Sequence, residues 1–205
     1  LVTGGAGFIG SHVVDRYLNE GHDVAVIDNL SPGFRSNVNP RARFYEADIC
    51  DVGAINGIFE RERPELVNHH AAQMDVRRSV EDPVFDASSN IIGSLNVILA
   101  SVKHNVRKFI YISTGGAVYG EPKYLPVDEN HPINPESQYG ISKHTVEHYL
   151  YLYQVHSGLA YTILRYPNVY GPRQNPKGEA GVIAIFIGQM LEGTAPSIYG
   201  NGEQV

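Results

Sequence analysis

Leu1-Val2-Thr3-Gly4-Gly5-Ala6-Gly7-Phe8-Ile9-Gly10 is the stretch that decides the fold of this chain. A short β-type run leads directly into glycines at three-residue spacing, and a helical pattern follows them. Gly4 allows a tight turn, Gly7 lets a phosphate approach the backbone, and Gly10 lets the helix pack closely on the strand. The stretch therefore predicts a strand, a turn and a helix whose first amides face the pyrophosphate of a dinucleotide.

The rest of the chain alternates short runs rich in Val and Ile with longer segments of helical period. This alternation is typical of βαβ units and of a parallel sheet. The expected strands are 1–3, 23–27, 43–46, 66–70, 108–113 and 160–164, and the expected helices are 8–19, 52–61, 83–104 and 136–156. The pattern predicts an α/β fold with a doubly wound parallel sheet of the Rossmann type.

An acidic residue at the end of the second strand indicates which dinucleotide is bound. Asp28 follows Gly10 by eighteen positions, close to the interval expected for a carboxylate that accepts hydrogen bonds from the adenosine ribose. A 2′-phosphate on that ribose would meet a like charge, so the sequence favours NAD. Arg35 keeps NADP open, since an arginine near this turn can accommodate the extra phosphate.

Tyr139 and Lys143 lie four residues apart near the start of a predicted helix, so their side chains share one face. A free tyrosine has a pKa of about 10, and acid–base work near neutral pH needs a decrease of about three units, or about 4 kcal/mol. An adjacent ammonium and a positive nicotinamide ring could supply it. The alternative is an ordinary surface pair, which such spacing often produces by chance.

Composition narrows the possible functions. Hydrophobic residues make up 42% of the 205 residues and charged residues 19%, which suits a globular α/β domain. The net charge of −6 argues against nucleic acid as a partner. Cys50 is the only cysteine, so we expect a reducing compartment, the cytoplasm. We expect no membrane span, no signal peptide and no metal site.

The texture of the sequence changes after Arg165. A Pro- and Gly-rich stretch at 175–181 is followed by an expected helix at 182–192 and a short strand at 197–199. We therefore expect an NAD-binding domain at 1–166 and the start of a small substrate-binding lobe at 167–205. Because the chain starts inside a strand and stops early in that lobe, we expect it to be incomplete at both ends.

Taken together, these features resemble the extended short-chain dehydrogenase/reductase family, and within it the UDP-glucose 4-epimerases of bacteria and archaea. The resemblance covers nearly the whole chain. It is carried by the glycine turn, Asp28, Tyr139 with Lys143, and the segments Asp48-Ile49, His69-His70-Ala71-Ala72-Gln73, Asn90, Ser113 to Gly120 and Arg165 to Gly171.

The resemblance implies a UDP-sugar substrate and a tightly held NAD. The implied catalytic residues are Tyr139, Lys143 and Thr114, and the implied substrate contacts are Thr114, Gly115, Tyr139 and Asn168. The implied NAD contacts are Gly4, Gly7, Phe8, Ile9, Gly10, Asp28, Asn29, Leu30, Ser31, Gly33, Asp48, Ile49, His70, Ala71, Ala72, Gln73, Asn90, Ser113, Tyr139, Lys143 and Pro167. A homodimer is also implied, in which the long helices ending near His104 and His156 pair across a two-fold axis.

One position departs from the family pattern. Gly115 stands where many relatives carry a catalytic Ser or Thr, so either Thr114 reaches in, or a water or the sugar's own hydroxyl fills the space. Relatives that dehydrate the sugar use an Asp-Glu pair here, and Gly115-Gly116-Ala117 has none. The sequence thus favours a 4-keto sugar that is reduced on its other face. A uronate epimerase, a decarboxylase, a reductase and a non-catalytic NAD-binding protein remain alternatives.

Other constellations are read as structural. His144-Thr145-Val146-Glu147-His148 matches the H-x-x-E-H pattern of some zinc peptidases, but solvated or subunit-facing histidines are expected. His69 and His70 are expected to pack or to hydrogen-bond rather than to bind a metal. Tyr149, Tyr151 and Tyr153 on one helix are expected to serve packing or an interface.

Overall fold

Six parallel strands form one sheet in the order β3-β2-β1-β4-β5-β6. The strands are β1 (Val2–Thr3), β2 (Ala25–Asp28), β3 (Arg43–Glu46), β4 (Leu66–His69), β5 (Lys108–Thr114) and β6 (Tyr161–Tyr166). This is the Rossmann order, in which the chain reverses direction across the sheet between β1 and β4, and ligands bind beyond the carboxyl ends of the strands at that point. The predicted fold class is confirmed.

The computed structural model describes residues 1–176, 181–198 and 200–202. The chain divides into two units, Leu1–Pro167 and Asn168–Val205. The first unit holds the sheet and seven α-helices, with a 3-10 turn at Arg35–Asn37 and a π-helical turn at Ser88–Ile92. Its helices are α1 (Phe8–Asn19), α2 (Val52–Glu62), α3 (Val76–Glu81), α4 (Pro83–Ala87), α5 (Gly93–Lys103), α6 (Gly115–Val118) and α7 (Gln138–Ser157).

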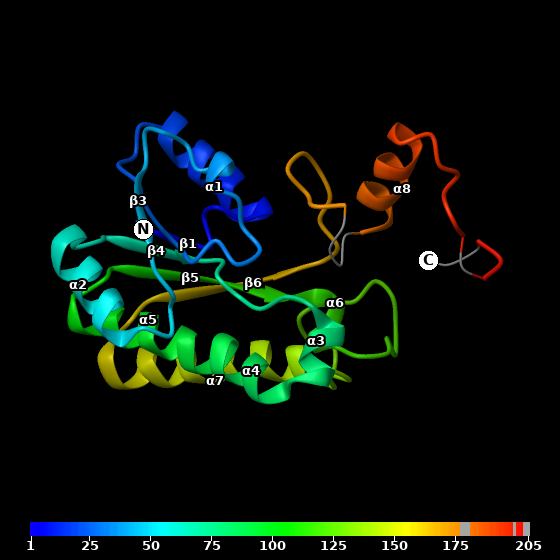
Figure 1. Cartoon of the computed structure of the whole chain (residues 1–205). Helices are drawn as coiled ribbons and strands as arrows, with labels where there is room; N and C mark the ends of the chain where they lie inside the picture. Colours follow the sequence, from blue (N-terminus) through cyan, green and yellow to red (C-terminus); the bar gives the residue numbers. More distant parts are fainter. Residues whose placement is uncertain (177–180, 199, 203–205) are drawn as a thin grey trace. The chain divides into compact units, whose positions relative to one another are not determined.

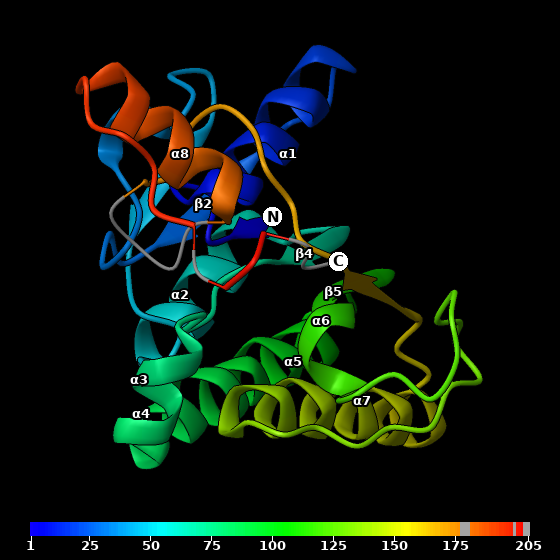
Figure 2. The same cartoon turned by 90° about the vertical axis from the view of Figure 1, so that its right-hand side faces the viewer.

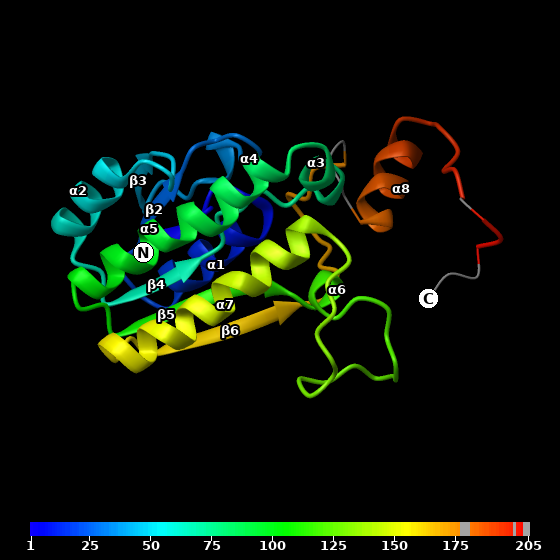
Figure 3. The same ribbon diagram turned by 90° about the horizontal axis from the view of Figure 1, so that it is seen from below.

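The sheet separates two hydrophobic cores. Helix α1 covers one face, and α2, α5 and α7 cover the other, with α5 and α7 lying side by side (Figures 1 and 3). In β2, Val26 packs into the core under α1, and its neighbour Ile27 packs into the core shared with α2, α5 and α7. Both side chains are 0% exposed, as expected for a strand that is buried on both faces.

Local sequence signals set most element boundaries. Helix α1 has the predicted bounds, and all six strands lie within two residues of the predicted ones. Helix α7 begins at Gln138 rather than 136, because the Ser137 side chain accepts a hydrogen bond from the Gly140 amide and caps the helix. It ends at Ser157, one residue past the predicted end, where Gly158 adopts a left-handed conformation.

Two short helices were not predicted, and one long helix is more complex than predicted. Helices α3 and α6 are only six and four residues long, too short to leave a periodic hydrophobic pattern. The predicted helix 83–104 is a helical run from Pro83 to Lys103 that contains the π-helical turn. Such turns commonly mark functional sites.

The run Pro83–Lys103 also corrects the expectation that no apolar segment approaches a membrane span. By length and composition alone this run could cross a membrane. A core helix passes the same test, and 44% of the tested window is buried within the fold. Val97 and Ile98 on this run are fully buried in the main core.

The second unit contains α8 (Val182–Leu191), which agrees with the helix predicted at 182–192. The strand predicted at 197–199 is wrong for Ser197 and Ile198, which are not extended in a ladder. Tyr199 and residues 177–180, part of the predicted Pro- and Gly-rich stretch, lie outside the described residues. The division between the two units follows Pro167.

Candidate active site

The glycine turn after β1 leaves no room for side chains. Gly4 has φ +68°, and a Cβ there would lie 2.6 Å from the Ala71 amide nitrogen. A Cβ on Gly10 would lie 2.2 Å from the Gly4 carbonyl oxygen. The Gly7 amide donates to that same oxygen, and Gly7 is the N-cap of α1. Steric demand and the left-handed turn therefore account for Gly4 and Gly10 as predicted.

The turn meets the loop that follows β4 at the carboxyl ends of the strands (Figure 2). The Ala71 amide donates to Thr3 Oγ1 over 3.1 Å, and Thr3 Oγ1 also contacts His69 Nδ1 at 2.7 Å. The second ring nitrogen of His69 lies 2.9 Å from Ser94 Oγ. His69 is thus a fully buried structural residue, as expected. The segment His70 to Gln73 is held beside the switch point.

Asp28 lies at the end of β2 and is 7% exposed. One carboxylate oxygen accepts from the Ala6 amide at 2.9 Å and the other from the Leu30 amide at 2.8 Å. The carboxylate therefore ties the glycine turn to the β2 end while retaining lone pairs for a ribose. Arg35, which kept NADP open, lies over the Phe44 ring at 4.3 Å.

The neighbouring residues predicted to contact NAD form a polar rim and a buried floor. Asn29 donates to Asp48 over 2.8 Å and accepts from the Ser31 amide, while Gly33 packs on Ala6. Ile49 differs from the rest, because it is 7% exposed and belongs to the main core. Its contact with NAD stays a prediction, as do those of Leu30, Phe8 and Ile9.

The π-helical turn places Asn90 against the loop after β4. Asn90 Oδ1 accepts from the Gln73 amide, and Asn90 Nδ2 donates to the Gln73 carbonyl, both over 2.9 Å. Asn90 Nδ2 also donates to Asp86 Oδ1. Because both Nδ2 hydrogens are used within the protein, Asn90 holds the loop in place, and a direct contact with NAD stays a prediction.

Tyr139 and Lys143 project from the buried side of α7. Lys143 is 3% exposed, which rules out the surface-pair alternative. Its ammonium lies 4.5 Å above the Tyr111 ring of β5. Burial, and then the charge of Lys143, lower the pKa values of His69 at the end of β4 and of His70 directly after it. The pair therefore lies beside the loops at the carboxyl ends of β4 and β5.

Burial dominates the electrostatics of this pair. Burial lowers the pKa of Lys143 to about 7, although the carboxylates of Glu147 and Asp86 oppose this shift. Burial and then the charge of Asp86 raise the pKa of Tyr139 to about 12. The direction for Tyr139 is opposite to the predicted one, because burial disfavours the phenolate and the negative charge of Asp86 disfavours it further.

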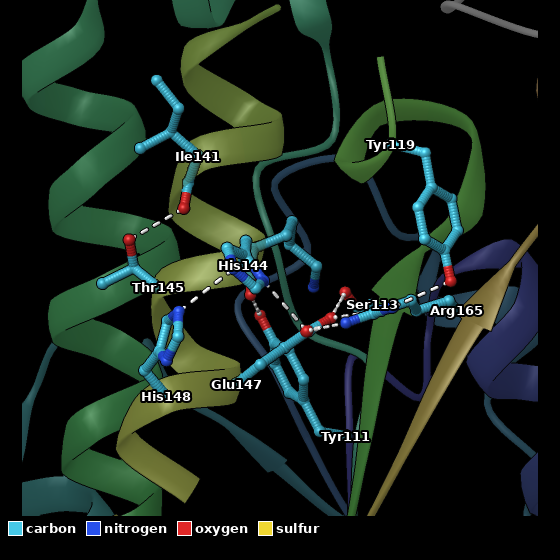
Figure 4. A network of polar contacts seen from close by, with 10 residues as sticks. Tyr111, Ser113, Tyr119, Ile141, His144, Thr145, Glu147, His148 and Arg165 are labelled. Carbon is cyan, nitrogen blue, oxygen red and sulfur yellow. Dashed lines mark hydrogen bonds and ion pairs between the residues drawn. The ribbon is translucent and has the colours of Figure 1, made fainter. Parts of the chain in front are cut away.

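A polar network around Glu147 joins α7 to β5 and β6 (Figure 4). Glu147 accepts from Ser113 Oγ and from Arg165 Nη2, each over 2.6 Å, and contacts His144 Nδ1 at 3.0 Å. Arg165 also donates to the Tyr119 hydroxyl. Ser113, predicted to contact NAD, is thus 3% exposed and turned toward Glu147.

The His and Glu side chains of the H-x-x-E-H segment contact one another and Arg165 within this network. Glu147 is paired with Arg165, and His148 lies 3.0 Å from His144 between their Nε2 atoms. In the described part of the chain, no three His, Cys, Asp or Glu side chains lie close enough together to hold a metal ion. Among Tyr149, Tyr151 and Tyr153 of α7, Tyr153 packs on the core and Tyr151 is exposed.

Thr114 and Gly115 lie where β5 turns into α6. Thr114 is half-buried and pairs in register with Tyr166 of β6. A Cβ on Gly115 would lie 3.2 Å from the Arg165 carbonyl oxygen, so a Ser or Thr there would press on the β6 backbone. Gly115 and Pro167 line a cavity of about 700 Å³ with Tyr119, Val127 and Arg165. Asn168 belongs to the second unit.

A dinucleotide fits the donor set of the first unit. The glycine cradle excludes side chains, and within the described residues no side chain caps the start of α1, so its amides are available to a pyrophosphate. The Asp28 carboxylate stands at the ribose end. The model for the NAD dependent epimerase/dehydratase family matches residues 1–205.

The chain belongs to this epimerase/dehydratase family. The match confirms the predicted family and its NAD dependence. The chain is 53% identical over its whole length to a putative UDP-glucose 4-epimerase of Methanocaldococcus jannaschii, of which it covers 67%. It is 44% identical to the UDP-glucose 4-epimerase of Mycolicibacterium smegmatis, with 98% of this chain and 66% of that protein covered.

Comparison with solved structures also finds UDP-glucose 4-epimerases. The UDP-glucose 4-epimerase of Thermotoga maritima with UDP-glucose matches with a TM-score of 0.96 and 53% identity, covering 98% of this chain and 66% of that one. This epimerase/dehydratase family member thus spans about two thirds of the length of its relatives.

Sequence reasoning missed the residues that hold the site together. Asp86, Ser79 and Ser142 are buried polar residues that contact Asn90, Tyr139 or each other. A signal existed for two of them, because Asp86 precedes Asn90 by one helical turn and Ser142 precedes Lys143 directly. The glycines and the Tyr-Lys pair drew the functional interpretation instead.

Proposed function

We propose that the whole protein interconverts UDP-glucose and UDP-galactose by oxidising the sugar at its 4-hydroxyl and re-reducing the 4-keto sugar on its other face. The observation that carries the proposal is that α7 carries the buried Lys143 and the half-buried Tyr139, and that Lys143 lies beside His70, whose backbone packs on Gly4 at the Rossmann switch point. The names of the similar proteins support it. A uronate epimerase, a decarboxylase and a reductase would use the same pair, but no comparison above favours them.

Each side chain has a distinct task in this proposal. Tyr139 Oη takes the proton from the sugar 4-hydroxyl and returns it to the same oxygen when the 4-keto sugar is re-reduced on its other face. Lys143 stabilises the phenolate by its positive charge, which its buried carboxylate neighbours help to retain. When bound, NAD supplies a hydride acceptor and a positively charged nicotinamide ring. Gly115-Gly116-Ala117 offers no acid–base pair for removing water.

Thr114 is proposed to donate a hydrogen bond to the sugar, in addition to the contact made by Tyr139. Thr114 is the last residue of β5, at the carboxyl edge of the sheet beside which Lys143 lies. A hydroxyl side chain at Gly115 would instead press on the β6 backbone. Substituting Thr114 by Ala should lower kcat about tenfold or more. Unchanged kcat in that variant would favour a water or the sugar's own hydroxyl in this role.

NAD, rather than NADP, is proposed as the cofactor of the first unit, with the cradle, Asp28 and the loops after β2, β4 and β5 as its contacts. The first unit would serve as the NAD-binding domain. The second unit, including Asn168, would begin the substrate-binding lobe that holds the UDP-sugar.

A homodimer is proposed from the outer faces of the long helices. Leu99 on α5 and Tyr151, Leu152 and Val155 on α7 are all more than 40% exposed. Light scattering of the full chain should give twice the chain mass, and a monomer would contradict the proposal.

We also propose a cytoplasmic location without a nucleic-acid or membrane partner, consistent with the net charge of −6 and the single Cys50.

The decisive experiment measures interconversion of UDP-galactose and UDP-glucose by the full chain without added NAD. Tyr139→Phe should lower kcat by about a thousandfold or more, because the proton acceptor is lost. Tyr149→Phe, which alters a half-buried tyrosine of the same helix outside the proposed dimer face, is the matched control and should keep the wild-type kcat. NAD binding without turnover of any nucleotide sugar would instead support a non-catalytic NAD-binding protein.

A further inference from the structure

A fully buried carboxylate lies outside the groups assigned above. Asp86, in the last turn of α4, is 0% exposed. Oδ1 accepts from Asn90 Nδ2 at 2.9 Å and from Gln73 Nε2 at 3.2 Å, and Oδ2 accepts from Ser142 Oγ at 2.6 Å. A buried carboxylate with three donors is a costly arrangement that a fold retains where the charge has a use.

The three donors come from three separate parts of the site. Gln73 lies in the loop after β4, Asn90 in the π-helical turn, and Ser142 on α7 directly before Lys143. A single carboxylate therefore fixes the Gln73 loop and the helix of the Tyr-Lys pair to the same point. The loop is fixed a second time through the reciprocal amide pair of Gln73 and Asn90.

The charge of Asp86 differs in character from that of Glu147. Two buried carboxylates act on Lys143, with Glu147 contributing more than Asp86. Glu147 is paired with the guanidinium of Arg165, whereas each of the three donors to Asp86 is neutral. Its negative charge is thus not paired with a cation in these three contacts. It acts on the Lys143 ammonium, whose charged form it favours, and on the Tyr139 phenol, whose pKa it raises.

We propose that Asp86 is a positioning residue of the active site, whose buried negative charge keeps Lys143 cationic and whose hydrogen bonds fix α7 and the Gln73 loop in register. The proposal rests on the proposed function for its activity readouts. It predicts that Asp86 and Ser142 affect turnover although neither touches the substrate.

The charged neighbours of Lys143 define what a titration would detect. Glu147 faces it from α7, Asp86 from α4, His69 and His70 from β4 and its loop, and Tyr111 from β5. Burial lowers the pKa of Lys143 to about 7, and Asp86 opposes this. Loss of the Asp86 charge should therefore leave Lys143 largely neutral at pH 7.

Asp86→Asn is the sharpest variant, because it keeps the shape and removes the charge. The new Oδ1 can still accept from Asn90 and Gln73, and the new amide group can donate to Ser142 Oγ. In ¹³C-lysine NMR of the full chain, with Lys143→Met assigning the signal, the pKa of Lys143 should fall by about one unit or more. This readout does not depend on turnover.

Activity gives the second readout. Asp86→Asn should lower kcat at pH 7 about tenfold or more and move the alkaline limb of the kcat profile, with KM for the UDP-sugar within about threefold of wild type. Glu81→Gln removes an exposed carboxylate five residues earlier and is the matched control, with wild-type values throughout. An unmoved Lys143 titration in a folded Asp86→Asn variant would overturn the proposal.

Ser142→Ala keeps the charge and removes one hydrogen bond, so it tests positioning alone. It should lower kcat severalfold while leaving the Lys143 titration in place. If Asp86→Asn does not fold, the kcat of Ser142→Ala tests the positioning role instead. A wild-type kcat in Ser142→Ala would contradict that role. An inactive wild-type chain in which Asp86→Asn still shifts the Lys143 titration would refute the proposed function but support this inference.

Discussion

Glu147 on α7 and Arg165 on β6 form an ion pair with an N–O distance of 2.6 Å, and their side chains are 5% and 19% exposed. Although burial alone raises the pKa of Glu147, hydrogen bonds from Arg165, Ser113 and His144 lower it overall. The pair anchors α7 to β6, the strand at one end of the sheet order, four residues after Lys143 in the sequence (Figure 4).

Removing one partner of this pair should be costly. Glu147→Ala leaves the Arg165 guanidinium partly buried without its carboxylate, so the free energy of unfolding should fall by about 2–4 kcal/mol. Urea denaturation of the full chain measures this. Glu65→Ala, which breaks the exposed pair with Arg107, should change it by less than about 1 kcal/mol. Equal losses in the two variants would show that burial does not strengthen the pair.

The glycine cradle should not tolerate even a methyl group. In Gly10→Ala the added Cβ would lie 2.2 Å from the Gly4 carbonyl oxygen, so the turn must shift. We expect a loss of about 1–3 kcal/mol in stability and at least tenfold weaker NAD binding, measured by calorimetry. Gly57→Ala, in open space on α2, should instead add up to about 1 kcal/mol and leave NAD binding unchanged.

Asp28 should select against the 2′-phosphate of NADP. In Asp28→Asn one oxygen acceptor for the Ala6 and Leu30 amides is lost, and so is the repulsion of a phosphate. NAD affinity should fall about tenfold. The ratio of NAD affinity to NADP affinity should fall by more than about tenfold, because NADP binding also gains from the lost repulsion. Glu46→Gln, which alters the exposed register partner of Asp28 on β3, should leave the ratio unchanged. A widened ratio in Asp28→Asn would contradict this assignment.

Stability should fall as the pH is lowered from 6.5 toward 5. Burial, and then the charge of Lys143, lower the pKa of His70 to about 4. Between that value and the ordinary 6.5, the unfolded chain binds more protons than the folded chain, so the free energy of unfolding rises with pH. His70 accounts for up to about 1.4 kcal/mol per pH unit.

His70→Asn should make this dependence shallower in urea titrations at pH 5–6.5, a range above the window in which the carboxylates lose their stabilising charge. His22→Asn, at an exposed histidine, serves as its control and should preserve the wild-type slope. An unchanged slope in His70→Asn would mean that His70 is protonated equally in the folded and unfolded states.

The sequence alone determined the elements whose signals are local. The Gly4-to-Gly10 turn, the bounds of α1 and the end of α7 at Gly158 follow from backbone sterics and periodicity within a few residues. The same local signals placed Asp28 at the end of a strand and Tyr139 with Lys143 near the start of a helix. These positions were enough to predict the family and its dinucleotide.

Only the tertiary structure decided which polar groups are buried together. The Asp86 contacts join residues 13 and 56 positions apart, and the Ser113 contact with Glu147 spans 34 positions. Periodicity within one helix cannot register such contacts, because their energy depends on desolvation by elements far away in the chain. For the same reason, the upward pKa shift of Tyr139 follows from its buried surroundings rather than from its spacing to Lys143.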